Sequence, residues 1–422
     1  MTTMTTAAFA RRSVTEHCRL VAEMVAAIER PTASVELSAL ETDHYRTLAA
    51  DVIAPGHLPP FDNSQMDGFA VHRADVVDAR PEHPVLLPVT GHIAAGDAAS
   101  ALPRGEAWAV MTGAPIPVGA DAVIPIESSG LTAFPSRGEV ASLTVREVPV
   151  ADAFVRRAGS DIRAGDVIAA AGAALTPALV GALASAGVRR LTVFRPFTVL
   201  LIATGSELRG QGETARPGSI LDANTPALTA LLTAIGVRVL TPGSVDDEPE
   251  QLLRAIDAHA HEVDLVVTAG GVSAGAHEVV REALGIRGVS FGSVAMQPGG
   301  PQGFGHLQVG TRRLPVVALP GNPVSALISA EVFVRPALLA AGGWWPGRPT
   351  VEAPITEDAE SPAGRLQVRR ARFTAAGRIE FVGGPGSHLL GSFARSDLLV
   401  LIPESVTRLE AGEIVRAWRI NG

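Results

Sequence analysis

The sequence predicts a multidomain chain that combines β-rich domains with a central three-layer α/β domain. Its 422 residues exceed the size of a single hydrophobic core, and 47% of them are apolar. Between residues 191 and 343, apolar runs alternate with helical patterns, as in a parallel sheet with helices on both faces. On either side of this stretch, short apolar runs alternate with Pro and Gly, which is typical of β-rich domains.

The part of the chain before residue 191 is predicted to contain two helices and a β-rich module. Apolar residues recur with helical spacing over residues 13–30. From about residue 70 to 154, runs such as "AWAVMTGA" and "DAVIPIE" predict short strands between turns. The second helix falls in the uncharged stretch 167–188, whose length would suit a membrane span.

That uncharged stretch contains its own start and stop signals. Thr176 is a predicted N-cap, Pro177 the first helical residue and Gly187 the stop. The helix is then about ten residues long, which is too short to span a bilayer. We therefore expect no membrane segment here.

Strands and helices alternate in order along the α/β part. "LTVFRPFTVLLIATGSEL" predicts one continuous buried strand, and "VDLVVTAGGVSAG" and "RLPVVALPGNP" predict further strands. A helix capped by Asn224 or Thr225 follows the first strand, and "EQLLRAIDAHA" and "EVVREAL" predict two more. Asn322 is predicted to cap a long helix, and residues 351–422 return to short strands.

Composition excludes several classes of function. The net charge of −8 argues against nucleic acid or an anionic membrane as the main partner. The single Cys18 excludes an internal disulfide and a cysteine metal cluster, and fits a reducing cytoplasm. All 35 basic residues are arginine, so a P-loop lysine and a Schiff-base lysine are excluded. Any bound anion must be held by arginine, backbone N–H groups, hydroxyls or a metal.

Three predicted strands in the α/β part end in small polar turns: "ATGSE", "TAGGVSAG" and "LPGNPVS". In an open parallel sheet such turns lie together at the carboxyl edge, where ligands bind. Glycines let backbone N–H groups approach an anion, and the following helix N-terminus favours negative charge. These turns predict a site for a phosphate-bearing ligand. The GxGxxG dinucleotide fingerprint is absent.

Acidic residues stand beside these turns, and for them two interpretations stay open. Glu207 and Asp246 lie on different connections that could converge on Mg²⁺, which prefers oxygen ligands. Asp247 and Glu248 are better explained as acids at a helix N-terminus. His259 and His261 are expected at a solvated helix end rather than at a metal. Three serines, Ser206, Ser273 and Ser325, have no candidate base beside them, so we expect hydrogen-bonding roles.

The segment "PPFDNSQMDGFAV", residues 59–71, is predicted to be a loop because its prolines forbid a helix and Asp-Asn-Ser favours turns. Gly68 gives conformational freedom next to the carboxylate of Asp67. The loop is either a domain junction or a device that presents Asp62, Ser64 and Asp67 to a ligand. Local chemistry does not decide between the two.

Taken together, these motifs resemble the molybdopterin molybdenumtransferase family, to which the C-terminal domain of gephyrin is related. The resemblance runs from about residue 16 to the end and rests on "PPFDNSQMDGFAV", "MTGAPIPVGADAVIPIE", "RRAGSDIRAGD", "LIATGSEL", "SILDAN", "TAGGVSAG", "LPGNPVSA" and "GSHLLGSF". It implies an enzyme that inserts molybdenum from molybdate into adenylylated molybdopterin and releases AMP, with Mg²⁺ as cofactor.

The resemblance also implies an elongated, cytoplasmic homodimer of four domains. These would be a discontinuous helical and linker domain (16–56 and 155–190), an inserted β-rich domain (57–154), an α/β domain for nucleotide and pterin (191–343) and a C-terminal β domain (344–422). The loop of the inserted domain would reach the partner subunit's site. A molybdopterin adenylyltransferase and apo-molybdoenzymes would be further partners, whereas nucleic acid and membranes would not.

Site residues follow from the same resemblance, position by position. The residues with implied catalytic roles are Asp67, Thr112, Glu207, Asp246, Glu278 and Arg365, with Glu207 and Asp246 as ligands of Mg²⁺. The residues expected to bind the nucleotide and pterin are Asn63, Ser64, Gly205, Ser206, Asp222, Asn224, Gly270, Gly271, Ser273, Gln297, Pro298, Gly299, Pro320, Gly321, Asn322, Ser325, Arg369 and Ser387.

In one segment the chain departs from the family pattern. Where the family often has Lys-Pro-Gly-Lys-Pro, this chain has "QPGGP", with Gln297 and Gly300 at the lysine positions. Losing two cations weakens a molybdate site unless arginines compensate, and Arg365, then Arg369 and Arg281, are the candidates. A non-catalytic molybdopterin-binding or scaffold protein is therefore the alternative function. An adenylyltransferase acting one step earlier is disfavoured, because the extra β domains and the "MDG" loop belong to the later step.

Overall fold

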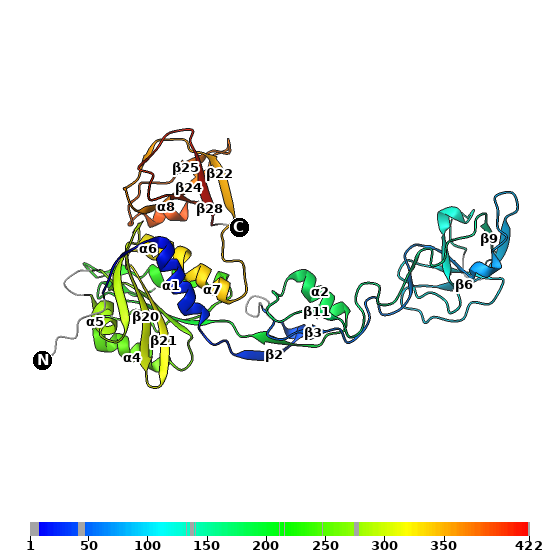
Figure 1. Cartoon of the computed structure of the whole chain (residues 1–422), viewed down its shortest axis with the longest axis horizontal. Helices are drawn as coiled ribbons and strands as arrows, with labels where there is room; N and C mark the ends of the chain where they lie inside the picture. Colours follow the sequence, from blue (N-terminus) through cyan, green and yellow to red (C-terminus); the bar gives the residue numbers. More distant parts are fainter. Residues whose placement is uncertain are drawn as a thin grey trace. The chain divides into compact units, whose positions relative to one another are not determined.

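The computed structural model describes residues 8–40, 47–131, 133–135, 139, 141–210, 212–214, 216–246, 248–273 and 278–420. The chain forms two compact units (Figure 1). The first unit holds the described residues of 1–33, 41–47 and 193–422, and the second holds those of 34–40 and 48–192. Asp247 of the predicted helix start lies outside the described residues.

The second unit is built on a five-stranded sheet of order β8-β5-β7-β6-β9. Its strands are β5 (Gly68–Val71), β6 (Val85–Ile93), β7 (Ala107–Val110), β8 (Ala122–Pro125) and β9 (Ala141–Val145). Buried Phe69, Val71, Leu87 and Leu143 form part of one core under this sheet. The predicted β-rich module is therefore confirmed.

Smaller elements complete the second unit. Two-stranded ribbons join β3 (Val52–Ile53) to β11 (Val167–Ala169) and β4 (Asn63–Ser64) to β10 (Val155–Arg156). A third ribbon joins β2 (Thr32–Glu36) to β12 (Arg190–Phe194), and the residues of both strands are divided between the two units. Short 3₁₀ turns span Leu37–Ala39, Arg73–Asp75 and Ile126–Ser128. Helix α2 (Pro177–Ser185) begins as predicted, because the hydroxyl of Thr176 accepts the N–H of Leu179. Gly187 follows its end with a positive φ of 83°.

The first unit contains a seven-stranded mixed sheet of order β1-β18-β20-β21-β17-β13-β16. Its strands are β1 (Ala8–Arg12), β13 (Thr198–Ala203), β16 (Arg238–Leu240), β17 (Leu265–Ala269), β18 (Val289–Val294), β20 (Pro301–Val309) and β21 (Arg312–Leu319). Strands β21, β17, β13 and β16 are parallel, as predicted. The sheet also contains β20, which is antiparallel to both β18 and β21, so it is mixed beyond these four strands.

Helices cover both faces of this sheet, so the α/β part has three layers (Figure 1). One face packs against α1 (Val14–Ala26), α3 (Asn224–Ala234), and the continuous helix formed by α6 (Pro323–Ser329), a π-helical turn (Ala330–Val334) and α7 (Arg335–Ala341). The other face packs against α4 (Pro249–His259) and α5 (Val279–Gly285). Along β13, Val199 and Leu201 face the first core while Leu200 and Ile202 face the second.

Two local predictions are corrected in this part. The apolar run from residue 191 is not one strand: it is split between β12 and β13 around Pro196, which lacks the N–H that a ladder needs. Helix α3 is not capped by Asn224 or Thr225. Instead, Asp222 Oδ1 accepts the backbone N–H groups of both residues, at 2.9 and 3.1 Å.

The helix Pro323–Ala341 is the one helix in the described part of the chain whose length and apolar composition would suit a membrane span. The share of its most apolar window that is buried inside the protein is 78%. Its side chains Val324, Ile328 and Phe333 belong to the core under the sheet. Its apolar character is thus explained by packing within the first unit.

The C-terminal part of the first unit is β-rich, as predicted. Its elements are β22 (Thr350–Pro354), β23 (Ala359–Glu360), β24 (Leu366–Phe373), β25 (Ile379–Phe381), α8 (Leu390–Ala394), β26 (Leu398–Ile402), β27 (Arg408–Leu409) and β28 (Ile414–Arg419). The main sheet has the order β19-β24-β26-β28-β22. Strand β19 (Met296–Gln297) comes from the α/β part and pairs in parallel with β24.

Candidate functional site

Parallel strands β13, β17 and β21 end side by side, and their three glycine-containing exits lie together, as the sequence predicts. The N–H of Thr204 donates to Ala269 O at 3.0 Å, and the N–H of Gly270 donates to Leu319 O at 3.1 Å. The exits border a cavity of about 470 Å³, which we call the carboxyl-edge cavity. Its size suits a small-molecule ligand.

Many of the predicted binding residues line the carboxyl-edge cavity. These are Gly205, Glu207, Asn224, Gly270, Gly271, Ser273, Glu278, Pro320, Gly321, Asn322 and Ser325. The lining residues that sequence reasoning missed include Thr204, Ile220 and Leu221. Ile220 and Leu221 form the two-residue strand β15 (Ile220–Leu221) and are 57% and 50% exposed. They give the cavity an apolar wall. So short an apolar pair in the sequence does not predict such a wall.

Two glycines are required by close approach of the exits. Gly270 has a φ of +116°, and a Cβ there would lie 2.5 Å from the carbonyl oxygen of Thr204. Gly271 has a φ of +61°, and its Cβ would lie 2.8 Å from the backbone nitrogen of Val280. A larger residue at Gly270 would force the β13 and β17 exits apart, and one at Gly271 would clash with the start of α5. The tight cradle of the cavity therefore depends on these two positions.

Buried polar atoms of the lining residues have unused hydrogen-bonding capacity. Thr204 Oγ1, Asn224 Oδ1 and Asn322 Oδ1 are buried and have no hydrogen-bond partner among the described residues. The amide nitrogen of Asn224 donates to Gly321 O at 2.7 Å, which fixes the orientation of that side chain. Buried polar groups normally find partners. A ligand with N–H and O–H donors would provide them.

The backbone brings the two predicted metal carboxylates into neighbouring segments. The N–H of Gly205 donates to Val245 O at 3.3 Å. Glu207 follows Gly205 by two residues, and Asp246 directly follows Val245, so the two carboxylates are on adjacent segments. Both side chains are exposed, and Glu207 lines the cavity. Among the described residues no group of three His, Cys, Asp or Glu side chains suits a metal. Two carboxylates with ligand phosphates and water nevertheless satisfy Mg²⁺.

Two predicted residues near this edge do not line the cavity. Asp222 is buried, with 6% of its surface exposed, and its carboxylate caps helix α3. Ser206 is exposed, and its carbonyl accepts Arg209 Nη1 at 2.9 Å. Asp222 thus acts on the position of Asn224, which it holds at the helix start. Direct contact between these two residues and a ligand stays a prediction.

The segment that replaces the family lysines is held in a fixed loop beside the cavity. Buried Gln302 donates its amide to Gly299 O and to Ser329 Oγ, each at 2.7 Å. Gln297 Oε1 accepts the amide of Gln367 at 3.2 Å, which links β19 to β24. Pro301, at the end of this loop, lines the cavity, whereas Gln297, Pro298 and Gly299 do not.

The candidate arginines differ in their freedom. Arg365 is exposed, and its guanidinium makes no hydrogen bond to the described residues. It directly precedes β24, whose first N–H, that of Leu366, donates to Ala295 O at 2.9 Å. Arg369 is buried with its Cζ 4.5 Å from the ring centroid of Phe381, and burial lowers the pKa of its guanidinium. Of the two, Arg365 is the one that solvent and a ligand can reach.

Arg281 and Arg370 support loops at the site. Arg281 Nη1 donates to Ser273 O at 3.4 Å. Arg370 is 2% exposed and donates to the carbonyls of Gly384 and Gly386, which fixes the loop that carries the predicted Ser387. Sequence reasoning missed Arg370, because a charged residue in a strand is normally assigned to the solvent face.

In the second unit, the predicted pair Asp67 and Thr112 is in direct contact. Asp67 Oδ1 accepts the backbone N–H of Thr112 at 2.7 Å and its hydroxyl at 2.8 Å. These two hydrogen bonds lower the pKa of Asp67 below its ordinary value. The carboxylate is therefore ionised at neutral pH and can only accept hydrogen bonds. Both residues are exposed at the surface of this unit.

Asn63 and Ser64, in the same loop as Asp67, make hydrogen bonds within the loop. Asn63 and Ser64 are buried; Asn63 donates to Phe61 O at 3.1 Å, and the hydroxyl of Ser64 donates to Met66 O at 2.5 Å. Their direct binding of a ligand stays a prediction. The prediction that Gly68 provides conformational freedom is wrong, because Gly68 lies in β5 and has no positive φ. Glycine is required there by close packing, since a Cβ would lie 2.3 Å from Ile124 O.

Known proteins resemble this chain over its full length. The family descriptions "MoeA N-terminal region (domain I and II)", "Probable molybdopterin binding domain" and "MoeA C-terminal region (domain IV)" match residues 12–187, 200–340 and 352–420. The molybdopterin molybdenumtransferase 2 of Mycobacterium tuberculosis is 42% identical over 97% of this chain and 100% of its own length. The molybdopterin molybdenumtransferase of Haemophilus influenzae is 33% identical over 94% of this chain and 97% of its own.

Solved structures agree with this similarity. A crystal structure of the molybdopterin biosynthesis MoeA protein from Pyrococcus horikoshii has a TM-score of 0.79 and 28% identity, and covers 98% of this chain and all of that one. A crystal structure of a molybdopterin biosynthesis MoeA protein from Pyrococcus horikoshii OT3 has a TM-score of 0.77 and 25% identity, and covers 97% of this chain and all of that one. With the fold, the glycine cradle and the full-length matches in agreement, the chain belongs to the molybdopterin molybdenumtransferase family and is a transferase of molybdenum cofactor biosynthesis.

Proposed function

We propose that the chain inserts molybdenum from molybdate into adenylylated molybdopterin, with Mg²⁺-dependent release of AMP, in the carboxyl-edge cavity. The observation that carries this proposal is the cradle of glycine exits with unpartnered buried acceptors at Thr204, Asn224 and Asn322. Adenine and pterin rings both carry N–H donors that such acceptors can bind. The backbone of Gly271, which is partly exposed and lines the cavity beside Gly270, would face the phosphates.

Glu207 and Asp246 are the residues that would hold Mg²⁺. The Gly205–Val245 hydrogen bond keeps their segments adjacent, and both carboxylates are free of ion pairs to the described residues. Bound there, the ion would polarise the phosphoryl group and neutralise charge as AMP leaves. The chain's own part is to hold the phosphates still, through backbone N–H groups fixed by the strand ends.

Molybdate is a dianion, so its site must supply cations or hydrogen-bond donors. Gln297 and Gly300 offer no charge, and we propose that Arg365 supplies it. The pairing of β19 with β24 keeps Arg365 beside the segment that contains Gln297. In the second unit, the ionised Asp67 and its partner Thr112 would position the reacting groups rather than donate a proton, since the pKa of Asp67 is lowered.

The metal proposal is tested by following AMP release as a function of Mg²⁺ concentration. We expect Glu207→Gln and Asp246→Asn each to raise the Mg²⁺ concentration required for half-maximal release by about tenfold or more. Glu250→Gln, an exposed carboxylate on α4, is the matched control and should behave as wild type. Unchanged Mg²⁺ dependence in both site variants contradicts the assignment.

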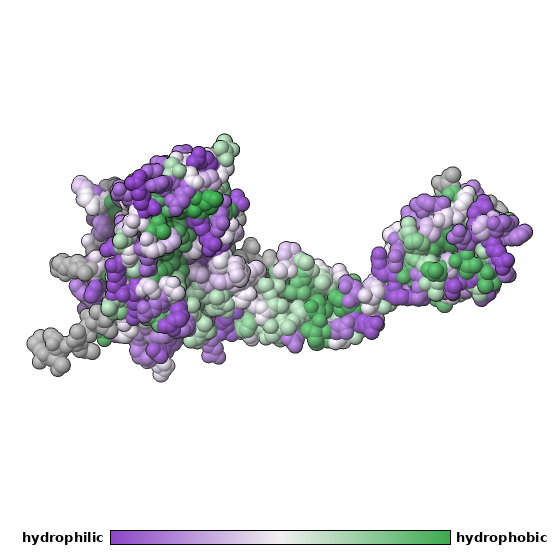
Figure 2. Space-filling model, turned by 45° about the horizontal axis from the view of Figure 1, so that its top comes forward, coloured by the Kyte–Doolittle hydropathy of each residue, from purple (hydrophilic) through white to green (hydrophobic). Residues whose placement is uncertain are grey.

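We also propose that the chain is a homodimer and that the face formed by α2, β3 and β11 contributes to the interface. Ile53 and Val167 are directly paired across the ribbon and are 51% and 55% exposed. Helix α2 has no charged residue, yet Leu183 is its one buried side chain. A helix that is apolar on all sides is normally covered. Figure 2 shows apolar residues gathered on the surface of this section of the chain.

Light scattering coupled to size exclusion tests this interface. The double variant Ile53→Asp, Val167→Asp should be monomeric, because two carboxylates would be buried without partners. Val77→Asp is the control, since Val77 is a 63% exposed valine elsewhere in the second unit. A wild-type monomer, or a double variant that stays dimeric, contradicts the proposal.

The remaining expectations fit this role and are proposed with it. The four predicted domains would divide the work: 16–56 with 155–190 for dimerisation, 57–154 for presenting Asp67, 191–343 for the nucleotide and pterin, and 344–422 for Arg365. The cytoplasm is the proposed location, with a molybdopterin adenylyltransferase and apo-molybdoenzymes as transient partners. Co-purification of such enzymes with the tagged chain would test the last point.

A further inference from the structure

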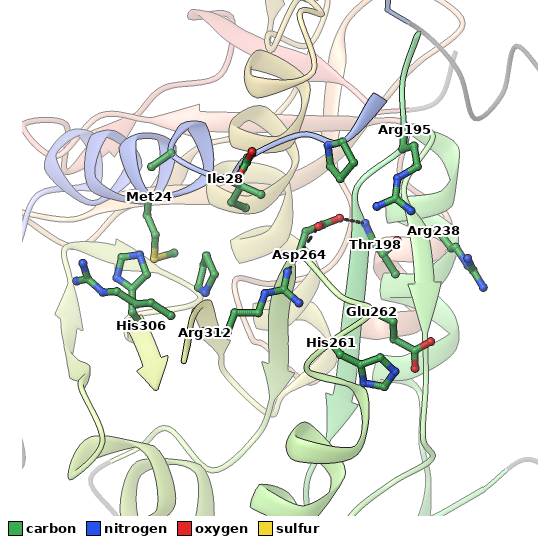
Figure 3. A pocket seen from close by; sticks show the side chains of 15 residues that line it. Met24, Ile28, Arg195, Thr198, Arg238, His261, Glu262, Asp264, His306 and Arg312 are labelled. Carbon is green, nitrogen blue, oxygen red and sulfur yellow. Dashed lines mark hydrogen bonds and ion pairs between the residues drawn. The ribbon is translucent and has the colours of Figure 1, made fainter. Parts of the chain in front are cut away.

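A second and larger cavity lies at the opposite edge of the central sheet. It has a volume of about 870 Å³ and is lined by residues at the starts of the parallel strands, among them Thr198, Arg238 and Arg312 (Figure 3). It shares no lining residue with the carboxyl-edge cavity. The length of β13 separates the two by about 20 Å, at about 3.3 Å per residue. We call it the amino-edge cavity.

The amino-edge cavity is rich in arginine within a chain of net charge −8. Its charged lining consists of Arg195, Arg238, Arg312 and Arg313 against Glu29, Glu262 and Asp264. One of these acids is already engaged, because Glu262 Oε1 and His259 Nδ1 are 2.6 Å apart. The cavity therefore carries local positive charge that the acids do not fully offset.

Arg195 and Arg238 come from neighbouring segments, and their charges act on the carboxylates of Asp264 and Glu262, respectively. Arg238 pairs with Thr198 in the ladder between β16 and β13, and Arg195 lies three residues before Thr198. Both side chains are exposed, and their guanidinium groups donate no hydrogen bond to any residue in the described part of the chain. Figure 3 shows both on the same side of the cavity. Two such groups suit a phosphate or carboxylate.

A carboxylate stands in the middle of the cavity wall. Asp264 Oδ2 accepts the N–H of Thr198 at 2.7 Å, and Oδ1 lies 3.9 Å from Arg312 Nη2 (Figure 3). Burial raises the pKa of Asp264, although Arg312, Arg195 and Arg30 oppose this. Oδ1 accepts no hydrogen bond from the described residues, so it can accept one from a ligand. Sulfate has no O–H group to donate at neutral pH, but a hydroxylated molecule does.

We propose that the amino-edge cavity is a second ligand site, for a small molecule with an anionic end and a hydroxylated body. Arg195 and Arg238 hold the anionic end, and Asp264 Oδ1 accepts a hydroxyl. Met24, in the last turn of α1, and Ile28, two residues beyond its end, form an apolar wall for the carbon skeleton. The volume is within the usual range for small-molecule sites. The site is independent of the transferase reaction proposed above.

Calorimetric titration of the full chain tests the proposal with three probes: ribose 5-phosphate, gluconate and inorganic sulfate. Ribose 5-phosphate or gluconate should bind, and whichever binds more tightly identifies the anionic group. The variant Arg195→Gln, Arg238→Gln should bind it about 100-fold more weakly. Asp264→Asn, which keeps an oxygen for Thr198, should weaken the hydroxylated probes but not sulfate, which has no O–H group. Arg254→Gln, an exposed arginine on α4 outside the cavity, is the control.

Three results overturn the proposal, provided that melting curves show the variants folded. The first is no binding of any probe at about 1 mM. The second is binding that the double arginine variant leaves unchanged, which would place the ligand elsewhere, such as in the carboxyl-edge cavity. The third is sulfate binding as tightly as the hydroxylated probes, which would remove the role of Asp264.

Discussion

Replacing His17 with leucine should make the first unit resistant to mild acid. His17 is fully buried in α1, and its ring centroid lies 5.9, 5.4 and 4.7 Å from those of Phe9, Phe304 and Phe333. Neither ring nitrogen has a partner among the described residues. Burial, and to a lesser extent the charge of Arg12, lowers its pKa from 6.5 to about 4.

The magnitude follows from that pKa. Between pH 6.5 and 4 the unfolded chain binds a proton at His17 that the folded chain does not, so stability is fully present above pH 6.5 and falls as the pH drops. At about 1.4 kcal/mol per pKa unit, the full loss is about 3 kcal/mol, and about 2 kcal/mol is lost by pH 5. Leucine fills the same apolar space without titrating.

Urea unfolding at pH 7.5 and pH 5, followed by tryptophan fluorescence, measures this difference. Three of the four tryptophans, Trp344, Trp345 and Trp418, belong to the first unit. Other groups also titrate over this range, so the test is the comparison between wild type and His17→Leu. Wild type should lose about 2 kcal/mol more than the variant. Equal losses in the two proteins would refute the reasoning.

Three further substitutions test the packing of the first unit. Gly270→Ala places a Cβ 2.5 Å from Thr204 O at a φ of +116°, so it should lower the free energy of unfolding by at least about 2 kcal/mol. Thermal unfolding measures this loss, and an unchanged melting temperature contradicts it. Glu331→Ala removes the two carboxylate oxygens that accept from Arg348 at 3.0 and 2.6 Å, and should cost about 3 kcal/mol. Urea unfolding measures this loss, and a change under about 0.5 kcal/mol contradicts it. Ser13→Ala removes the N-cap of α1 and should destabilise the helix by about 1 kcal/mol. Hydrogen exchange in the first turn of α1 should become faster, and unchanged protection contradicts this.

The sequence predicted those features that depend on residues close together along the chain. Thr176 and Pro177 set the start of α2, because capping depends on residues that are near in sequence. The three glycine turns predicted the carboxyl-edge cavity, since parallel strands end at a common edge. Uninterrupted apolar runs indicated buried strands, and β13 and β17 are buried on both faces.

Features that depend on distant contacts could not be read from the sequence. The antiparallel β20 is held by its hairpin with β21, and its small polar residues gave no strand signal. Asp222 rather than Asn224 caps α3, because the turn before the helix decides which side chain reaches the N–H groups. Arg370 is buried because carbonyls of a loop 14 and 16 residues away surround it. Pairwise geometry of this kind appears only in the folded chain.

The most direct test of the central claim is AMP release from adenylylated molybdopterin by the purified protein, started by adding micromolar molybdate in the presence of Mg²⁺. Wild type should release AMP in a molybdate-dependent way and activate an apo-molybdoenzyme, whereas Asp67→Ala and Arg365→Ala should each lose at least about 100-fold in rate. Arg408→Ala, an exposed arginine of the same C-terminal part, should keep wild-type activity. Tight binding of the adenylylated substrate with no AMP release at any molybdate concentration would contradict the account.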